Sequence, residues 1–419
     1  MPPPTSPQPT ARVHPIVWLI LFLPFGATSG FVQVTIGFLA KQQGIGDATI
    51  ASLVAINLLP HTFKFFWAPL PDTLLTRRTW YLASNVVSSI TLVAVGWAPV
   101  QNDTVSLLRT LIFINAVAIT FLGMATEGLM AIVVTDDERG RASGWLQAGN
   151  LGGSGVGGGL ALFLAQRIGP HLGVTVVAIA LLACSVCLLF VQEPRHQHAS
   201  LLQAFGNVVV DLWDTIIRTR QGLLAMILCF LPVGSAAAAG LFSAIAGRWQ
   251  TSADSVALYT GVLGGLVSAV GCLGGGWLSD QMDRKRAYAV TGFFLAGVAA
   301  GMAVGPHNEF GYATFTLAYQ FGSGLAYGAF TGFVLEAIGR GAVATKYNAL
   351  ASLSNIPIGY MTEIDGWASE KWNPDVMLWV DGASEVLAGI IFLTIAWLLL
   401  RSVKSRLAES QGTPRGAES

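Results

Sequence analysis

Long apolar runs, separated by short polar segments, recur along almost the whole chain. A helix needs about 20 apolar residues to cross the hydrocarbon core of a membrane, so each run is long enough for one crossing. The pattern therefore predicts an all-α integral membrane protein. The twelve expected spans are residues 16–39, 48–70, 80–99, 107–134, 143–166, 171–192, 222–247, 255–279, 287–305, 311–338, 346–368 and 376–400.

The spacing of these runs predicts two groups of six helices. Only one connection is long, and it is polar and amphipathic. We therefore expect an N-terminal tail, a six-helix bundle, a linker, a second six-helix bundle and a C-terminal tail at residues 1–15, 16–192, 193–221, 222–400 and 401–419. The first run is too long for a signal-peptide core and lacks a clear cleavage site, so it is expected to remain as the first span.

Basic residues indicate how the chain is oriented. Counted on alternate sides of the spans, 17 of the 23 Lys and Arg residues fall on the side of the two termini and the linker, and five fall on the other side. Cytoplasmic loops carry an excess of Lys and Arg. Both termini and the linker are therefore expected in the cytoplasm.

Composition narrows the function classes. Hydrophobic residues make up 53% of the chain and charged residues 11%, which is too few charges to cover a soluble enzyme. With a net charge of zero, nothing implies a nucleic-acid partner. No His, Asp and Cys group has catalytic or metal-ligand spacing, and Cys184-x-x-Cys187 lies in an apolar span, where packing explains it. We expect no enzyme activity, no metal site and no cofactor.

Glycines in the fifth span follow a helical spacing. Gly149, Gly153 and Gly157 recur every four residues, as do Gly155 and Gly159. Such rows form smooth ridges that let another helix approach closely and move. We expect this span to pack tightly against its neighbours.

A short charged signature occurs twice, after the second and the eighth span. The two copies, 208 positions apart, are Leu70-Pro-Asp72 followed by Arg77-Arg78, and Leu278-Ser-Asp280 followed by Arg284-Lys285-Arg286. Repeated punctuation of this kind is typical of internally duplicated secondary transporters. We expect Asp72 and Asp280 to hold neighbouring helix ends through Arg, Lys or backbone N–H groups, and so to act in gating rather than in solute binding.

The second copy also carries a family resemblance. Together with the twelve spans and the central loop, Gly276-Trp-Leu-Ser-Asp280-Gln-Met-Asp-Arg284-Lys-Arg286 resembles the loop motif of the major facilitator superfamily. The first copy departs from that motif by Pro69 and Pro71. The resemblance implies two pseudo-symmetric six-helix bundles that rock around a midplane site.

A narrower resemblance covers most of the chain. It begins at Pro60-His-Thr-Phe-Lys64-Phe-Phe-Trp-Ala-Pro69-Leu-Pro-Asp72, which is similar to the second-span signature of the peptide–acetyl-coenzyme A transporter family. That family includes bacterial muropeptide permeases, and related small permeases import siderophores. Further similarity lies at residues 138–140, 158–162, 344–353 and 366–367.

This resemblance implies a proton-coupled permease of a bacterial inner membrane. Its expected solute is a bulky polar molecule such as a muropeptide, a siderophore or a related conjugate. The muropeptide branch carries a Lys and an Asp in the seventh span, where this chain has Pro232 and Ser235, and an Arg in the eleventh, where it has Ile358. These departures leave the solute open.

Two alternative functions remain beside import of a solute. A drug or metabolite exporter of the same fold would run protons the other way, and a membrane sensor or enzyme would need a site that the sequence lacks. The expected partners are a small-molecule solute and the lipid bilayer, with the chain acting as a monomer. The proton gradient is the expected energy source.

Lys64 and Glu127 are the first candidates for coupling. A charge within a span costs roughly 2.5–3.5 kcal/mol unless it is paired or hydrated. The two residues fall at similar depths in spans that the family fold makes neighbours, so they are expected to pair. Alternatively, Lys64 reaches the cytoplasmic headgroups. A carboxylate kept from water can hold a proton near neutral pH, which makes Glu127 the expected coupling residue.

The second half offers further candidates. Glu336 lies near the position that corresponds to Glu127, although it could also be an interfacial charge. Glu385 is expected to bridge helices, whereas Glu363 and Asp365 are expected to face the outer mouth.

Uncharged polar residues complete the expected solute site. The family fold lines its cavity with spans 1, 4, 7 and 10, and span 11 adds two amides. The candidates are Gln33, Tyr319, Gln320, Tyr327, Asn348 and Asn355. Pro24-Phe-Gly26 in span 1 and Pro232-Val-Gly234 in span 7 are expected bending points.

Overall fold

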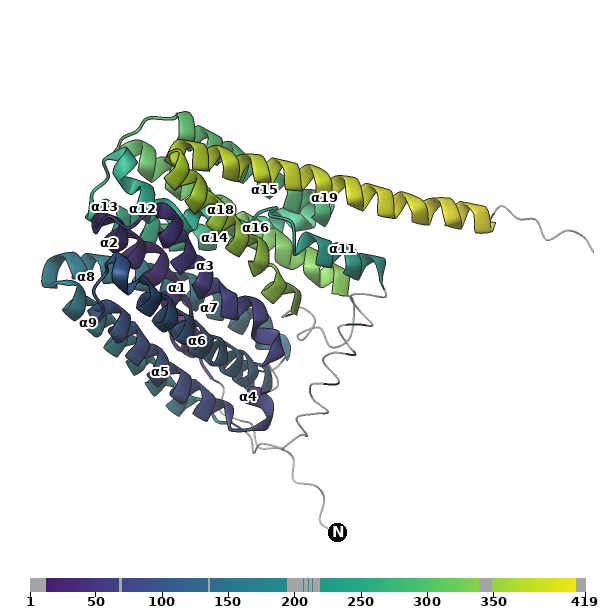
Figure 1. The fold of residues 1–419 in the computed structure, drawn as a ribbon. Coiled ribbons are helices and arrows are strands. Elements are labelled where there is room, and N and C mark those ends of the chain that lie inside the picture. The colour runs from purple at the N-terminus through teal and green to yellow at the C-terminus, as the bar shows by residue number, and fades with distance from the viewer. Residues whose placement is uncertain are drawn as a thin grey trace, which may run out of the picture.

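The computed structural model describes residues 13–67, 70–134, 136–193, 206, 210, 213, 219–338 and 349–411. Every regular element in this part of the chain is a helix, and the helices form two bundles that lie side by side (Figure 1). Most of the predicted N-terminal tail and of the predicted linker lies outside the described residues. The expected all-α fold is confirmed.

The first bundle has helical segments at each of the six spans expected there. Its elements are α1 (Ile16–Gly30), the π-helix η1 (Phe31–Ile36), α2 (Gly37–Gln42), α3 (Asp47–Phe63), η2 (Lys64–Phe66), α4 (Leu70–Thr73), α5 (Arg77–Trp97), η3 (Asn102–Thr104), α6 (Val105–Val133), α7 (Asp136–Gly155), η4 (Val156–Leu160), α8 (Ala161–Ile168), α9 (Pro170–Ala183) and η5 (Cys184–Phe190). Helix α1 packs along α7, and α5 packs along α6.

The second bundle repeats this plan with more interruptions. Its elements are α11 (Arg220–Leu228), η7 (Ala237–Leu241), α12 (Phe242–Ile245), η8 (Ala246–Trp249), α13 (Ala253–Val256), η9 (Ala257–Val262), α14 (Leu263–Gln281), α15 (Arg284–Val304), α16 (Glu309–Ile338), α18 (Asn355–Lys371) and α19 (Pro374–Gln411). Helix α14 packs along α16, and α15 along α19. Helix α19 continues past its predicted end at residue 400 and projects from the bundle in Figure 1.

Eight of the twelve predicted spans are continuous and apolar enough to cross a membrane among the described residues. The other four expected spans, 143–166, 222–247, 311–338 and 346–368, are richer in glycine or polar residues, or are interrupted. All four contribute side chains to the cavity described below. Because a helix that borders a polar cavity needs no fully apolar surface, the weaker hydropathy of these spans has a physical reason.

The span expected over 222–247 is not one continuous helix. Helix α11 ends at Leu228, and regular structure resumes only at Ala237. Gly234 and Ala236 between them take left-handed backbone angles, with φ of 66° and 51°. The bending point expected at Pro232-Val-Gly234 is thus a full break. By contrast, Pro24 lies inside the continuous helix α1.

The glycine ridge of the fifth span packs as predicted. A methyl group added at Gly153 would lie 2.2 Å from the carbonyl oxygen of Leu23 in α1. One added at Gly159 would lie 2.5 Å from the carbonyl oxygen of Ala257 in the other bundle. One face of this span therefore fixes α1, and another face holds the two bundles together.

Candidate functional site

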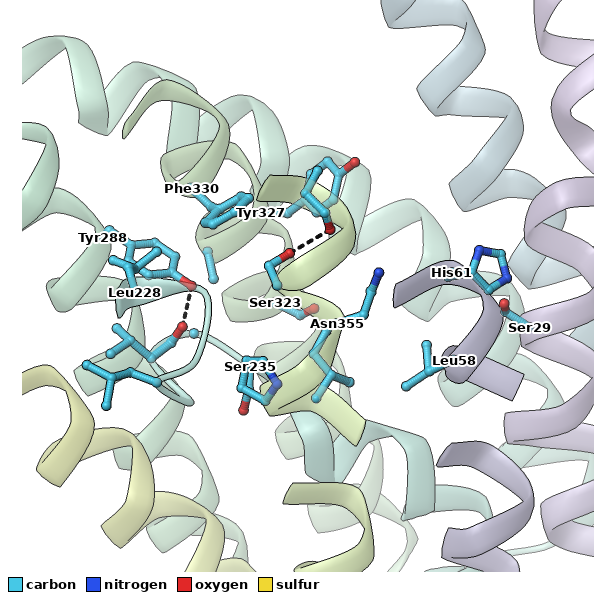
Figure 2. A pocket seen from close by; sticks show the side chains of 18 of the residues that line it. Ser29, Leu58, His61, Leu228, Ser235, Tyr288, Ser323, Tyr327, Phe330 and Asn355 are labelled. Carbon is cyan, nitrogen blue, oxygen red and sulfur yellow. Dashed lines mark hydrogen bonds between the residues drawn. The ribbon is translucent and has the colours of Figure 1, made fainter. Parts of the chain in front are cut away.

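A cavity of about 280 Å³ lies between the two bundles. The first bundle contributes side chains from α1, α3, η2 and α7, and the second from α11, the break after it, α15, α16 and α18. Figure 2 shows polar groups on both walls, including His61 and Ser29 on one side and Ser323, Tyr327 and Asn355 on the other. The cavity can therefore offer hydrogen bonds to a solute from both halves of the protein.

Lys64 supplies a positive charge to this cavity. It begins the short helix η2 at the end of α3, is partly buried, and lines the cavity wall. Among the described lining residues it is the only Lys or Arg, and none of them is an Asp or Glu. The solute-binding role of Lys64 stays a prediction, and its position in the cavity favours an anionic group on the solute.

His61 is a cavity residue that the sequence reasoning missed. It lies one helical turn before Lys64, is 7% exposed, and packs edge-on against Phe25 with ring centroids 5.1 Å apart. Its Nε2 has no hydrogen-bond partner in the described chain. A buried imidazole nitrogen of this kind can bind a solute group that enters the cavity. A histidine within an apolar span was the available signal.

The expected pair of Lys64 and Glu127 is not formed in this conformation. Glu127 lies on α6 and is partly buried, and no ion pair between these two described residues is recorded. Its neighbour Gly128 packs against Arg77, whose Nε would lie 2.6 Å from an added methyl group. Pairing in another conformation stays a prediction.

The remaining solute candidates divide into two groups. Tyr327 and Asn355 line the cavity. Tyr319 is fully buried inside the second bundle, where its hydroxyl donates to Asp381, so its expected place on the cavity wall is wrong.

Gln33 and Gln320 also lie elsewhere. The carbonyl oxygen of Gln33 accepts a hydrogen bond from Ser243 of the other bundle. Gln320 packs beside Gly264. Neither is among the cavity-lining residues. Asn348 and the side chain of Glu336 lie outside the described residues.

Helix starts in the gating loops are held by carboxylates that the sequence reasoning missed. Glu193 accepts the backbone N–H groups of Arg77 and Arg78 at 2.9 and 3.1 Å. An acceptor at a helix N-terminus satisfies free N–H groups and complements the helix dipole. The side chain of Asp72 lies outside the described residues, so its own role stays a prediction.

The second gating loop uses an aspartate in the same way. Asp283 accepts the backbone N–H groups of Lys285 and Arg286, both at 3.2 Å, at the start of α15. Arg284 donates to the carbonyl oxygen of Gly332 on α16, at 3.3 Å. This loop therefore ties α15 to α16, while the side chain of Asp280 lies outside the described residues.

The bundles are joined at the end away from the linker. Among the described residues, every recorded side-chain hydrogen bond between the bundles lies there. The bonds run from Ser369 to Asp47 at 2.6 Å, from the Ala48 N–H to Glu370 at 2.9 Å, from Arg167 to Asp254 at 2.9 and 3.1 Å, and from Ser243 to the Gln33 carbonyl. We call this set the outer seal. The cavity lies on its linker side.

Comparison with known proteins agrees with this architecture. The Major Facilitator Superfamily profile matches residues 17–359. An anhydromuropeptide permease of Escherichia coli is 25% identical over 404 residues, covering 93% of this chain and 80% of that protein. A putative transporter, AmpG 4, of Rickettsia felis is 21% identical over 375 residues, covering 82% of this chain and 89% of that protein.

A solved structure shows the same fold. A POT family transporter in complex with a thioalcohol-conjugated peptide superposes with a TM-score of 0.71 at 10% identity, over 92% of this chain and 96% of that one. The matched profile spans well over half of the chain, and the relatives align along most of their length. The chain therefore belongs to the Major Facilitator Superfamily and is a multi-pass membrane transporter.

Proposed function

We propose that this permease imports an anionic sugar–peptide conjugate of the muropeptide class into the cytoplasm, driven by the proton gradient. The observation that carries the proposal is the cavity between the bundles, with Lys64 and His61 on one wall and hydroxyl and amide groups on the other. The similarity to an anhydromuropeptide permease supports this class of solute.

The chemistry of the cavity fits such a molecule. Lys64 attracts a carboxylate, Ser323 and Asn355 offer hydrogen bonds to hydroxyl and amide groups, and the aromatic rings of Tyr327 and Phe330 can cover the apolar face of a sugar. The volume lies near the lower end of ordinary ligand sites, which span about 300–1,000 Å³. In this conformation the cavity encloses one part of a bulky solute.

Two departures from the muropeptide branch point to a less charged solute. Ser235 and Ile358, which stand where that branch carries an Asp and an Arg, both line the cavity. An uncharged lining there removes two partners for charged groups of a peptide. We infer that this permease prefers a conjugate with fewer charges than the one its muropeptide relatives are expected to carry.

The excess of Lys and Arg on the linker side supports cytoplasmic termini and a cytoplasmic linker. With that orientation, the outer seal closes the periplasmic end and the cavity faces the cytoplasm. The division into bundles at residues 16–192 and 222–400, and action as a monomer, are parts of the same proposal. Reporter fusions at Arg195 and Arg286 test the orientation, and extracytoplasmic signals from both would contradict it.

Uptake into proteoliposomes tests the function. Labelled anhydromuropeptide should accumulate under an inwardly directed proton gradient and should stop accumulating when a protonophore is added. Lys64→Ala should raise the half-saturating concentration for the anionic solute, because the cavity loses its cationic partner. Lys371→Ala, which removes a cation outside the cavity, is the matched control.

Competing solutes separate the alternatives. Uptake of a ferric siderophore but not of anhydromuropeptide would replace the proposed solute. Proton-driven efflux of lipophilic cations without uptake of either would make the protein an exporter. For coupling, Glu127→Gln should keep solute exchange and lose accumulation if Glu127 carries the proton.

A further inference from the structure

Three carboxyl groups meet in the interior of the second bundle, outside the cavity lining. Asp365 lies on α18, and Asp381 and Glu385 lie one turn apart on α19, on one face of that helix. All three are fully buried, with 0% of their surface exposed. The sequence expectation that Asp365 faces the outer mouth is wrong, whereas the expected bridging role of Glu385 is confirmed.

Two of the three have protein donors and one has none. Glu385 accepts the Gly234 N–H at 2.5 Å, the Ser235 hydroxyl at 3.1 Å and the Ala236 N–H at 3.3 Å. Asp381 accepts the Tyr319 hydroxyl at 2.7 Å. Neither oxygen of Asp365 has a donor among the described residues.

Asp365 instead faces Asp381. The two carboxyl groups lie within hydrogen-bonding reach of each other, and Oδ1 of Asp381 has no donor in the described chain. Two carboxylates both accept and neither donates, so such a contact is a hydrogen bond only when one of them carries a proton. The geometry therefore assigns a shared proton to this pair.

Charge leads to the same assignment. Within the described chain, none of the three carboxyl groups forms an ion pair with Lys, Arg or His. Removing several like charges from water without counter-charges costs several kcal/mol for each ion. Coupled carboxyl groups escape that cost by keeping protons, as a pair rather than singly.

The other titratable side chains around the cluster already donate hydrogen bonds. The hydroxyls of Tyr288 and Tyr360 donate to the carbonyl oxygens of Val233 and Phe230, and Cys229 donates to the carbonyl oxygen of Leu350. Together with Tyr319, these are the titratable side chains that act electrostatically on the cluster or on its tyrosines. None of them is basic, so the carboxyl groups are left to hold the proton.

The cluster is connected to the cavity through the break after α11. Glu385 accepts the N–H groups of Gly234 and Ala236, which this break leaves without helical partners. Residues 233–235 of the same break line the cavity (Figure 2). A change in the cluster therefore reaches the cavity wall directly.

The cluster is also connected to the outer seal through α18. Gly366, next to Asp365, packs so closely on α3 that an added methyl group would lie 2.2 Å from Cβ of Ala51. One turn further, Ser369 and Glu370 make two bonds of the seal. Helix α18 thus lies between α19 and the first bundle, and at Gly366, beside Asp365, it packs directly on α3.

We propose that the Asp365–Asp381 pair, with Glu385, is the site that holds the transported proton and that this proton keeps the outer seal closed. The proposal rests on the proton coupling proposed above. Loss of the proton leaves two facing carboxylates, which repel each other. Because α18 packs directly on α3 at Gly366, next to the pair, this repulsion acts on the first bundle and parts the bundles at the outer end. Protonation on the outer side then closes the seal behind the bound solute.

A spin-label distance across the seal tests this without any solute. Labels at Gln43→Cys and Lys371→Cys, in full-length protein with its four native cysteines replaced by alanine, report the seal in nanodiscs as pH is varied. Linkage of one proton predicts that the ratio of closed to open seal falls by up to about tenfold per pH unit through the titration. Asp365→Asn, which cannot lose a proton, should stay closed at every pH.

Matched variants decide the outcome. Glu363→Gln removes an exposed carboxyl group from the same helix and should keep the wild-type pH dependence. Asp381→Asn should abolish the pH dependence of the spin-label distance. This variant provides a second test if Asp365→Asn folds poorly. A wild-type distance that does not change with pH overturns the proposal, as does a pH dependence lost in Glu127→Gln but kept in both aspartate variants.

The seal measurement and the uptake assay fail separately. A pH-dependent seal in a protein that takes up no anhydromuropeptide refutes the proposed solute and leaves the proton site standing. Proton-driven uptake by a protein whose seal does not respond to pH refutes the proposed proton site and leaves the proposed solute standing.

Discussion

The first and seventh spans stand at corresponding places in the two halves, and they differ in the feature that their sequences share. Both carry a proline followed two residues later by glycine, at Pro24 and Gly26 and at Pro232 and Gly234. In the first span the helix continues through the proline, and in the seventh it breaks. The same local signal thus has two outcomes.

The surroundings explain the difference. A broken helix at membrane depth needs other partners for its backbone groups. Around the seventh span, Glu385, Tyr288 and Tyr360 supply them. Around the first span, Gly26 instead lies so close to α7 that an added methyl group would meet the Asn150 carbonyl oxygen at 1.7 Å. Close packing favours an intact helix, and buried acceptors favour a break.

The largest effect is expected when Glu385, the main hydrogen-bond acceptor at the break in the seventh span, is replaced. Glu385→Leu leaves the buried N–H groups of Gly234 and Ala236 without partners, at a cost of about 1–3 kcal/mol each. We expect a large fall in the thermal unfolding temperature in detergent and loss of uptake. Glu385→Gln keeps one acceptor oxygen and should recover part of the stability. Equal stability of Glu385→Leu and wild type would contradict the role of Glu385 in the break.

Substitution at the two proline–glycine signals should give opposite results. Gly234→Ala places a side chain at positive φ, at a cost of roughly 1–2 kcal/mol, and its methyl group would lie 2.9 Å from Cβ of Ala326. Pro24→Ala restores a helical N–H and should keep or raise the unfolding temperature. A similar loss in both variants would show that the first span also needs its proline.

The gating loops offer a second comparison between the halves. Glu193→Ala removes the acceptor from two N–H groups at the start of α5 and should cost about 0.5–2 kcal/mol. Asp283→Asn should change stability by less, since Asn caps a helix about as well as Asp. Unfolding in denaturant measures both, and a larger loss in Asp283→Asn would mean that its charge matters more than its capping bonds. In both variants the rate of solute transport should fall without a matching loss of solute affinity.

The smallest effect is expected at the rim of the outer seal. Arg167 and Asp254 are about half exposed, at 49% and 55%. An exposed pair of this kind contributes about 0.2–1 kcal/mol, so Arg167→Ala should open the seal only slightly in the spin-label measurement. Ser369→Ala, which removes a buried bond to Asp47, should open it further. The reverse order would place the main closing contact at the rim.

The local sequence was sufficient to predict features that depend on whether a side chain meets water or lipid. Lys64 was recognised because a charge in an apolar run must be paired or hydrated, and it lines the cavity. The local sequence was insufficient to place Tyr319. The family pattern predicts it on the cavity wall, whereas in the structure it lies against Asp381. His61 and Glu193 were missed because a single polar residue shows nothing of its partner.

The sequence by itself determined the helical class, the succession of twelve spans and the uneven distribution of basic residues. These follow from hydropathy, which acts residue by residue. Only the tertiary structure decided that Asp365, Asp381 and Glu385 meet, that the seventh span breaks, and that Ser369 reaches Asp47. Such contacts join helices far apart in the chain, and their formation depends on how whole helix faces pack, which no local period encodes.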